Sequence, residues 1–335
     1  MKVSPSLYSS SSGTDETVKV IRNTVAEYIH IDIKDCSNLK SVKKDIEIIR
    51  KNSDLSVDIH LIEPHPAKYI DEIKVLSPDF LAVQYEDLVD VQDFYKLKDC
   101  LLRVGIAIIM KVDFEEVSEL VRDSNYVLLM TTTPGESGGS FTDESIQWIE
   151  SFIERFPGKK VHVDGGVNDI VAEKIRKLKI DCVVSGSYLM KSPSMVASVL
   201  KLKGVDASEK LKNHMISADY IPVVRENDSV FDCMKAIECG QRGFCFVFGE
   251  NKWGIVTDGD IRRFLVSKNP KRNSLGKKAK ELTNFKPYKL SVEQDIEGLL
   301  KFLIEENIEK KLKFIVLVEY NKPVGIFNME KITKV

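Results

Sequence analysis

Long apolar runs are missing from this sequence of 335 residues. No stretch approaches the roughly 18 consecutive apolar residues of a membrane-spanning helix. The first residues, MKVSPSLYS, also lack the apolar core of a secretory signal peptide. We therefore expect a cytoplasmic protein that works without a membrane partner.

Cysteine pairs with metal-binding spacing are also absent. The six cysteines show no C-x-x-C pattern, which argues against disulfides and against a structural zinc site. An excess of one charge is missing too, because 49 Lys and Arg residues face 51 Asp and Glu residues, for a net charge of −2. This balance argues against a nucleic-acid-binding surface as the main function.

What the sequence does contain is a repeated alternation of short β-branched runs with charged segments. Segments 41–52 and 169–179 have helical spacing, and apolar runs flank such segments through the first two-thirds of the chain. Strands that alternate with helices indicate a parallel sheet with βαβ crossovers. The runs are KVSPSLYS, YIHIDI, SVDIHLI, FLAVQY, RVGIAIIM, NYVLLMT, KVHVDG and DCVVSG. Their number and spacing predict a closed (β/α)8 TIM barrel over residues 1–204.

The pattern changes after the barrel region. We expect a linker over 205–216, followed by a smaller α/β domain over 217–335. A strand, turn and helix order occurs there twice, over 217–268 and 280–335, and this repeat predicts two similar modules. One alternative is that such a pair is a dimerisation module and nothing more. We expect a homo-oligomer formed through these modules, the barrel, or both.

Polar side chains gather at the expected ends of the barrel strands. In YIHIDI the alternation places His30 and Asp32 on one face, with Lys34 next in line. His60 and Asp164 end two further strands, and Ser6 ends the first. Because catalytic groups of such barrels lie at the C-terminal ends of strands, we expect these residues to converge. Two imidazoles and two carboxylates suit one divalent Zn, Fe, Mn or Co ion better than Mg.

Glycine-rich segments follow the last three expected strands: TPGESGG over 133–139, DGG over 164–166 and SGS over 185–187. That end of a barrel often binds a phosphate through backbone amides. The candidate phosphate-binding residues are Gly138, Gly139, Gly166, Gly186 and Ser187, and Gly135 is a further candidate for substrate binding.

Residues 1–203 resemble ribulose-phosphate 3-epimerase. The matching stretches, in the order of that family, are SPS at 4–6, HID at 30–32, DIHL at 58–61, MTTTPGESGGSF at 130–141, VDGGVN at 163–168 and SGS at 185–187. The resemblance implies a metal ion bound by His30, Asp32, His60 and Asp164. It also implies that Asp32 and Asp164 act as acid and base on opposite faces of a ketose phosphate. Epimerisation would then pass through an enediolate, whose charge a metal ion stabilises, and Ser6 would contact a substrate oxygen or water.

The sequence departs from this family around the expected substrate. Lys34, Cys36 and Ile62 replace the family's usual methionine, glycine and methionine, and the loop with Glu136 and Ser137 differs from the usual NPGFGGQ. The substrate therefore stays open: D-ribulose 5-phosphate with D-xylulose 5-phosphate, or a related sugar phosphate.

Asp32 and Lys34 also begin the D-x-K-x-x-D motif of orotidine-phosphate decarboxylase and its lyase relatives, although Ser37 stands at the last position. A lyase or decarboxylase is therefore an alternative to the epimerase. A barrel without catalytic activity that serves as a nucleotide-sensing scaffold is another.

Residues 217–335 resemble a tandem pair of CBS domains, through GIVTDGDIRR at 254–263. The resemblance implies that Thr257 and Asp260 contact the phosphate and ribose of an adenine or cytidine nucleotide, with the base in a slot formed by the backbone around Ile221 and Val223. The second repeat has Asn328 and Lys331 in place of this Thr and Asp. We therefore expect one regulatory nucleotide per chain.

Overall fold

The computed structural model describes residues 1–335 apart from 136–140, 207, 267–273, 307–311 and 330–335. Gly138, Gly139, Glu136, Ser137 and Lys331, which the sequence singles out, lie outside the described residues. The chain divides between residues 207 and 208 into two compact units, in which a short segment near residue 306 is grouped with the first. In the described part of the chain, none of the helices has the length and apolar character needed to cross a membrane. The cytoplasmic location stays a prediction.

The first unit is a TIM barrel, as the sequence predicts. Its described residues form a sheet of 8 parallel strands in the order β1-β8-β7-β6-β5-β4-β3-β2. β1 pairs with β8, and an isolated parallel bridge between Ser6 and His30 links the β1 end to β2. The strands are β1 (Lys2–Pro5), β2 (Tyr28–Ile33), β3 (Ser56–Leu61), β4 (Phe80–Gln84), β5 (Val104–Ile109), β6 (Val127–Met130), β7 (Val161–Asp164) and β8 (Cys182–Ser185).

The period of two along each strand separates an outer core from the barrel interior. On β2, Ile29, Ile31 and Ile33 are buried in the core that also includes the apolar faces of the helices. His30 and Asp32 alternate with them and point to the other side, into the barrel. Parallel strands in such a barrel are buried on both faces, which explains why the runs are so apolar.

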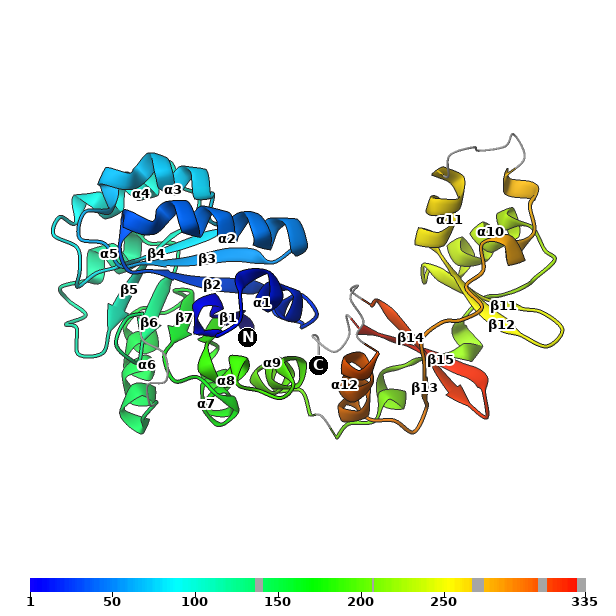
Figure 1. Ribbon diagram of the computed structural model, residues 1–335. Coiled ribbons are helices and arrows are strands. Elements are labelled where there is room, and N and C mark those ends of the chain that lie inside the picture. Colours follow the sequence, from blue (N-terminus) through cyan, green and yellow to red (C-terminus); the bar gives the residue numbers. More distant parts are fainter. Residues whose placement is uncertain (136–140, 207, 267–273, 307–311, 330–335) are drawn as a thin grey trace. The chain divides into compact units, whose positions relative to one another are not determined.

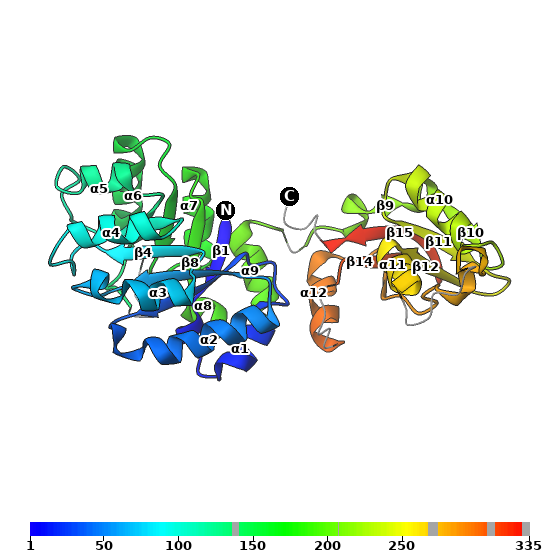
Figure 2. The same ribbon diagram turned by 90° about the horizontal axis from the view of Figure 1, so that it is seen from above.

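The barrel helices lie outside the strands in both views (Figures 1 and 2). In α2, Leu39, Val42, Ile46 and Ile49 recur at helical spacing and are buried, because they form the stripe that faces the sheet. The helices are α1 (Thr14–Ile21), α2 (Leu39–Asn52), α3 (Ile70–Leu76), α4 (Gln92–Cys100), α5 (Ser118–Asp123), α6 (Asp143–Arg155), α7 (Asp169–Ile175), α8 (Ser187–Met190) and α9 (Met195–Lys203). Short 3-10 helices lie at Leu7–Ser9, Cys36–Asn38, Pro66–Tyr69 and Arg176–Leu178.

The second unit contains the predicted repeat. In each half a strand pairs in parallel with the next strand, which pairs in antiparallel with a third. The first half comprises β10 (Val223–Arg225), α10 (Val230–Gly240), β11 (Phe244–Phe248), β12 (Trp253–Thr257) and α11 (Asp258–Val266). The second comprises β13 (Lys289–Ser291), α12 (Ile296–Glu305), β14 (Phe314–Glu319) and β15 (Lys322–Asn328). Short 3-10 helices lie at Leu211–His214, Ala218–Tyr220, Ser274–Gly276 and Ala279–Glu281.

The two halves exchange the segments that precede them. β9 (Ile216–Ser217), which precedes the first half, pairs with β15 of the second. Asn284, which precedes the second half, exchanges two backbone hydrogen bonds of 3.0 Å with Ile255 of β12. Each exchange gives an edge strand a partner. Lys280 and Asn284, at the start of the predicted second module, thus bond to the first half, and Ile216 at the end of the predicted linker 205–216 belongs to β9.

Candidate active site and metal centre

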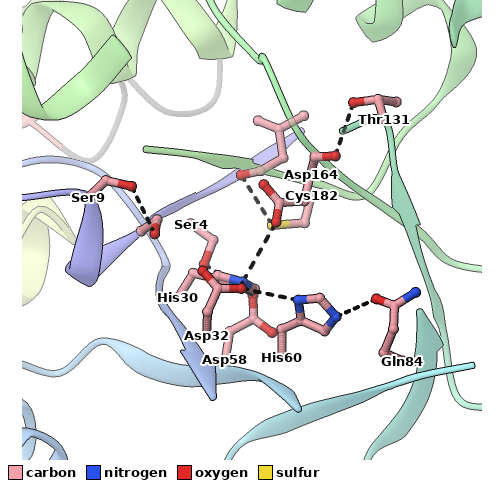
Figure 3. Close-up of polar contacts among 12 residues, drawn as sticks. Ser4, Ser9, His30, Asp32, Asp58, His60, Gln84, Thr131, Asp164 and Cys182 are labelled. Carbon is pink, nitrogen blue, oxygen red and sulfur yellow. Dashed lines mark hydrogen bonds and ion pairs between the residues drawn. The ribbon is translucent and has the colours of Figure 1, made fainter. Parts of the chain in front are cut away.

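The predicted metal ligands meet at the C-terminal ends of three strands. His30 and Asp32 come from β2, His60 from β3 and Asp164 from β7, and one ligand atom of each lies within 4.8 Å of the others (Figure 3). The parallel register of β2 and β3 places Asp32 beside His60. Nitrogen and carboxylate donors at this spacing are a suitable set for a divalent transition metal ion.

His30 is held by a buried hydrogen-bond chain. Its Nδ1 lies 2.9 Å from Oδ2 of Asp58, which also accepts a hydrogen bond of 3.2 Å from Oγ of Ser4. Its Nε2 is buried and makes no hydrogen bond within the described residues, and it lies 3.4 Å from Asp32 and 3.9 Å from Asp164. If Nδ1 carries the proton donated to Asp58, Nε2 presents a lone pair to the cluster, as a metal-binding histidine requires.

His60 is oriented in the opposite sense. Its Nε2 lies 2.7 Å from Oε1 of Gln84, and its Nδ1 lies 3.1 Å from Oδ1 of Asp32 (Figure 3). The amide nitrogen of Gln84 donates to Glu86, which fixes Oε1 as the atom that faces the imidazole. With its proton on Nε2, His60 offers Nδ1 to the same point that Nε2 of His30 faces.

Asp58 and Gln84 orient predicted ligands, and neither was predicted from the sequence. Asp58 stands two residues before His60, so the alternation of β3 places both inside the barrel. Gln84 is the last residue of β4, so it also belongs to the set of polar strand ends. These two patterns were the available signals for them.

The buried charges shift each other's protonation. Burial disfavours the charged imidazole of His30, but the carboxylates of Asp58 and Asp32 outweigh it and hold the pKa well above its ordinary value. Burial likewise opposes ionisation of Asp32, yet the charge of His30 keeps the pKa of Asp32 low. Burial raises the pKa of Asp164 to about 6, and the nearby charge of Asp32 adds to this effect. Opposite shifts on neighbouring carboxyl groups are typical of an acid and base pair.

A cavity of about 870 Å³ opens above the cluster. Asp32 and Asp164 line it, whereas His30 and His60 are fully buried beneath. The cavity walls also include the predicted substrate-binding residues Ser6, Lys34, Gly135, Gly166, Gly186 and Ser187. The remaining predicted ones, Gly138 and Gly139, lie outside the described residues.

The glycines permit close backbone packing at the cavity. Gly166 has a φ of +63°, which favours glycine. A Cβ on Gly186 would lie 2.2 Å from Oγ of Ser9, so no larger residue fits between the ends of β1 and β8. Ser9 in turn donates a hydrogen bond of 3.3 Å to Ser6. These contacts bring backbone amides to the cavity wall.

In the second unit, Thr257 and Asp260 form a capping box at the start of α11. Oδ2 of Asp260 accepts hydrogen bonds from the amide and hydroxyl of Thr257, at 2.9 and 2.7 Å, and Oγ1 of Thr257 accepts from the amide of Asp260. Oδ1 of Asp260 pairs with Arg263. Ile221 is buried and Val223 is 58% exposed. The predicted nucleotide residues thus already have structural contacts.

Comparison with known proteins decides the family of the barrel. The model of the ribulose-phosphate 3 epimerase family matches residues 2–190. The chain belongs to the ribulose-phosphate 3-epimerase family. It is an isomerase-class family of sugar-phosphate epimerases.

Relatives in the epimerase family match the barrel along nearly their whole length. The ribulose-phosphate 3-epimerase of Helicobacter pylori is 28% identical over 217 residues, which are 62% of this chain and 99% of that protein. The enzyme of Bacillus subtilis is 26% identical, over 61% of this chain and 99% of its own. The predicted resemblance to this family is confirmed.

The C-terminal part is similar to solved structures with CBS domains. CBSX2 in complex with AMP is 19% identical, with a TM-score of 0.30, over 37% of this chain and 93% of that chain.

Proposed function

We propose that the barrel epimerises a ketose phosphate at a carbon next to its ketone, with D-ribulose 5-phosphate and D-xylulose 5-phosphate or a related sugar phosphate as the reacting pair. The observation that carries the proposal is the cluster of two imidazoles and two carboxylates at the floor of a polar cavity. A carbon acid of this kind needs a base, an acid and a means of stabilising charge on oxygen.

His30, Asp32, His60 and Asp164 would hold one Zn, Fe, Mn or Co ion. The fit rests on the buried Nε2 of His30, which has no hydrogen bond within the described residues and lies among the other three donors. When bound, the ion would supply Lewis-acid stabilisation of negative charge on the enediolate. Asp58 and Gln84 would keep both imidazoles in the required tautomers.

Asp32 and Asp164 would move the proton. The low pKa of Asp32, against burial, keeps a carboxylate beside His30 that can accept a proton from carbon. The pKa of Asp164, raised by burial to about 6, allows it to hold a proton near neutral pH and to return one. Removal on one face and return on the other invert the carbon, and the two residues exchange roles in the reverse direction.

Backbone amides would bind the phosphate. Gly166 follows β7, and Gly186 and Ser187 follow β8, so all three reach the cavity from neighbouring strands. Amide donors on such loops bind phosphate oxygens without adding a charge of their own. Gly135, after β6, would also contact the substrate, and Ser6 would bond a substrate oxygen or water. The substrate phosphate would thereby be fixed relative to Asp32 and Asp164.

For the second unit we propose one adenine or cytidine nucleotide per chain, near Thr257, Asp260, Ile221 and Val223. Thr257 and Asp260 stand where a strand meets the first turn of a helix, a position at which amides attract phosphate. In the second half Asn328 ends the corresponding strand in place of Thr257, and the sequence has Lys331 in place of Asp260, so this repeat lacks the carboxylate proposed to bind ribose. The assembly of chains into a homo-oligomer belongs to the same proposal, and light scattering on the purified protein tests it.

The decisive experiment is metal analysis followed by NMR of pentulose and hexulose phosphates in D₂O. The proposal expects one transition metal ion per chain and deuterium at a carbon next to the ketone. Release of a fragment or of CO₂ would instead favour the lyase or decarboxylase with Asp32 and Lys34. If the protein catalyses neither reaction but binds a nucleotide, the barrel is a nucleotide-sensing scaffold without catalytic activity.

A further inference from the structure

Lys34 extends across the opening of the cavity. It follows the end of β2, whereas Gly135 follows β6, and these two strands lie on opposite sides of the eight-stranded barrel. Yet a Cβ on Gly135 would lie 2.6 Å from Cε and 3.4 Å from Cγ of Lys34. The lysine stem therefore packs against the backbone of the opposite rim.

Gly135 leaves the space that this arrangement needs. Its φ of +69° and the contact with Cε both disfavour any larger residue. Ile62 adds an apolar contact, since its Cδ1 would lie 3.2 Å from the same Cβ. The stem is thus held by packing on two sides while the ammonium group stays at the cavity.

The ammonium group has no anionic partner in the described part of the chain. Lys34 is exposed and lines the cavity, and the structure gives it neither a hydrogen bond nor an ion pair among those residues. The neighbouring carboxylate of Asp35 accepts the amide of Ser37 at 2.7 Å instead. The substrate can therefore supply the anion that pairs with Lys34.

The cavity is larger than a pentulose phosphate requires. Its 870 Å³ equals the share of liquid occupied by about thirty waters, roughly twice the number of non-hydrogen atoms in that sugar phosphate. The walls include Gly186 and Ser187 after β8, and Lys34 and Asn38 after β2. The cavity therefore has room for a substrate group in addition to a pentulose phosphate.

We propose that Lys34 binds a second anionic group of the substrate, a phosphate or a carboxylate, in addition to the phosphate that the backbone amides bind. The substrate class rests on the proposed epimerase function, whereas the binding of an anion by Lys34 does not. Lysine recognises either anion as a point charge. The substrate class is then a ketose bisphosphate or a phosphorylated keto acid, and Lys34 determines specificity.

Solvent exchange tests the reaction. The rate of deuterium incorporation is measured for a pentulose 5-phosphate, a pentulose 1,5-bisphosphate and a phosphorylated keto acid, with wild type and Lys34→Met. We expect kcat/KM for one doubly anionic substrate, divided by that for pentulose 5-phosphate, to fall about 10- to 100-fold in the variant. Lys44→Met, the same change on the exposed face of α2 outside the cavity, should leave the ratio alone. The responding substrate identifies phosphate or carboxylate as the anion.

Calorimetry separates this inference from the epimerase proposal. A pentitol 1,5-bisphosphate and a pentitol 5-phosphate, which cannot react, are titrated into wild type, Lys34→Met and Lys191→Met. Lys34→Met should weaken only the bisphosphate, whereas Lys191, a cavity lysine just after α8, should affect both ligands. Preserved discrimination between the two ligands in Lys34→Met, with an unchanged exchange ratio, would overturn the inference. Lysine-dependent bisphosphate binding without solvent exchange would uphold it and contradict the epimerase.

Discussion

Replacement of Asp164 by asparagine should stabilise the metal-free barrel while it removes the reaction. Burial and the charge of Asp32 raise the pKa of Asp164 from 3.8 to about 6. For an acid with a raised pKa, the stability contribution is complete below the unfolded value of 3.8 and is lost as the pH rises through 6. At neutral pH, ionised Asp164 therefore lowers the free energy of unfolding.

The magnitude follows from the size of the shift. About two pKa units at 1.36 kcal/mol each give an upper limit of about 3 kcal/mol at pH 7.5. Asparagine has nearly the same shape but no charge, so the metal-free variant should unfold at higher urea concentration at pH 7.5. The difference should shrink towards zero near pH 4, where aspartic acid itself is neutral.

The assay follows the barrel alone. Trp148 packs against the barrel core, and the other tryptophan, Trp253, belongs to the second unit. Urea unfolding by tryptophan fluorescence, in a Trp253→Phe background with chelator, therefore reports the barrel. Asp54→Asn, at an exposed loop carboxylate, is the matched control and should change stability little.

The same variant loses the reaction if Asp164 transfers a proton. Solvent deuterium exchange should fall about 10²- to 10⁴-fold with metal restored, while metal binding partly survives. Equal unfolding of wild type and Asp164→Asn at every pH would refute the argument from buried charge. Exchange at the wild-type rate would mean that Asp164 is a ligand only.

Three further predictions concern other parts of the chain. His60→Ala should lose most of the bound metal, as measured by elemental analysis, and an unchanged metal content would contradict the proposed ligand set. Burial lowers the pKa of His162 to about 4, so stability should decline as the pH falls from 6.5 towards 4. His162→Phe should recover about 2–3 kcal/mol of that loss at pH 4.5 in urea titrations of the metal-free protein, and an unchanged pH profile would contradict this. Calorimetry with AMP, ADP, ATP, CMP and CTP should give one site per chain that Asp260→Ala weakens, and two equal sites or undiminished binding would exclude it.

The barrel could be predicted because its strands are short, apolar and separated by helical segments. Each predicted run contains one observed strand. The ends of parallel strands lie on one rim of a barrel, so polar residues at those ends must approach one another. That rule alone brought His30, Asp32, His60 and Asp164 together, without knowledge of their distances.

The supporting residues were harder to predict because they depend on pairing between strands. Asp58 orients His30 since the register of β2 and β3 places the two residues side by side. A shift of the register by one residue would turn Asp58 to the opposite face. Gln84 meets His60 from the next strand, and a single strand-end glutamine carries no motif. The exchange of β9 and Asn284 between the halves was missed for a similar reason, because similar halves offer equivalent edges.

Thr257 and Asp260 have two candidate roles, in the capping box of α11 and in the proposed nucleotide site. The T-x-x-D spacing that resembles a nucleotide contact is also the spacing of a capping box, and the structure contains the capping box. A carboxylate has about four sites for accepting hydrogen bonds. Thr257 uses two of them on Oδ2, and Arg263 faces Oδ1. Ribose hydroxyls would therefore compete with the exposed Arg263 rather than with the cap, so a nucleotide can bind without unwinding the first turn of α11.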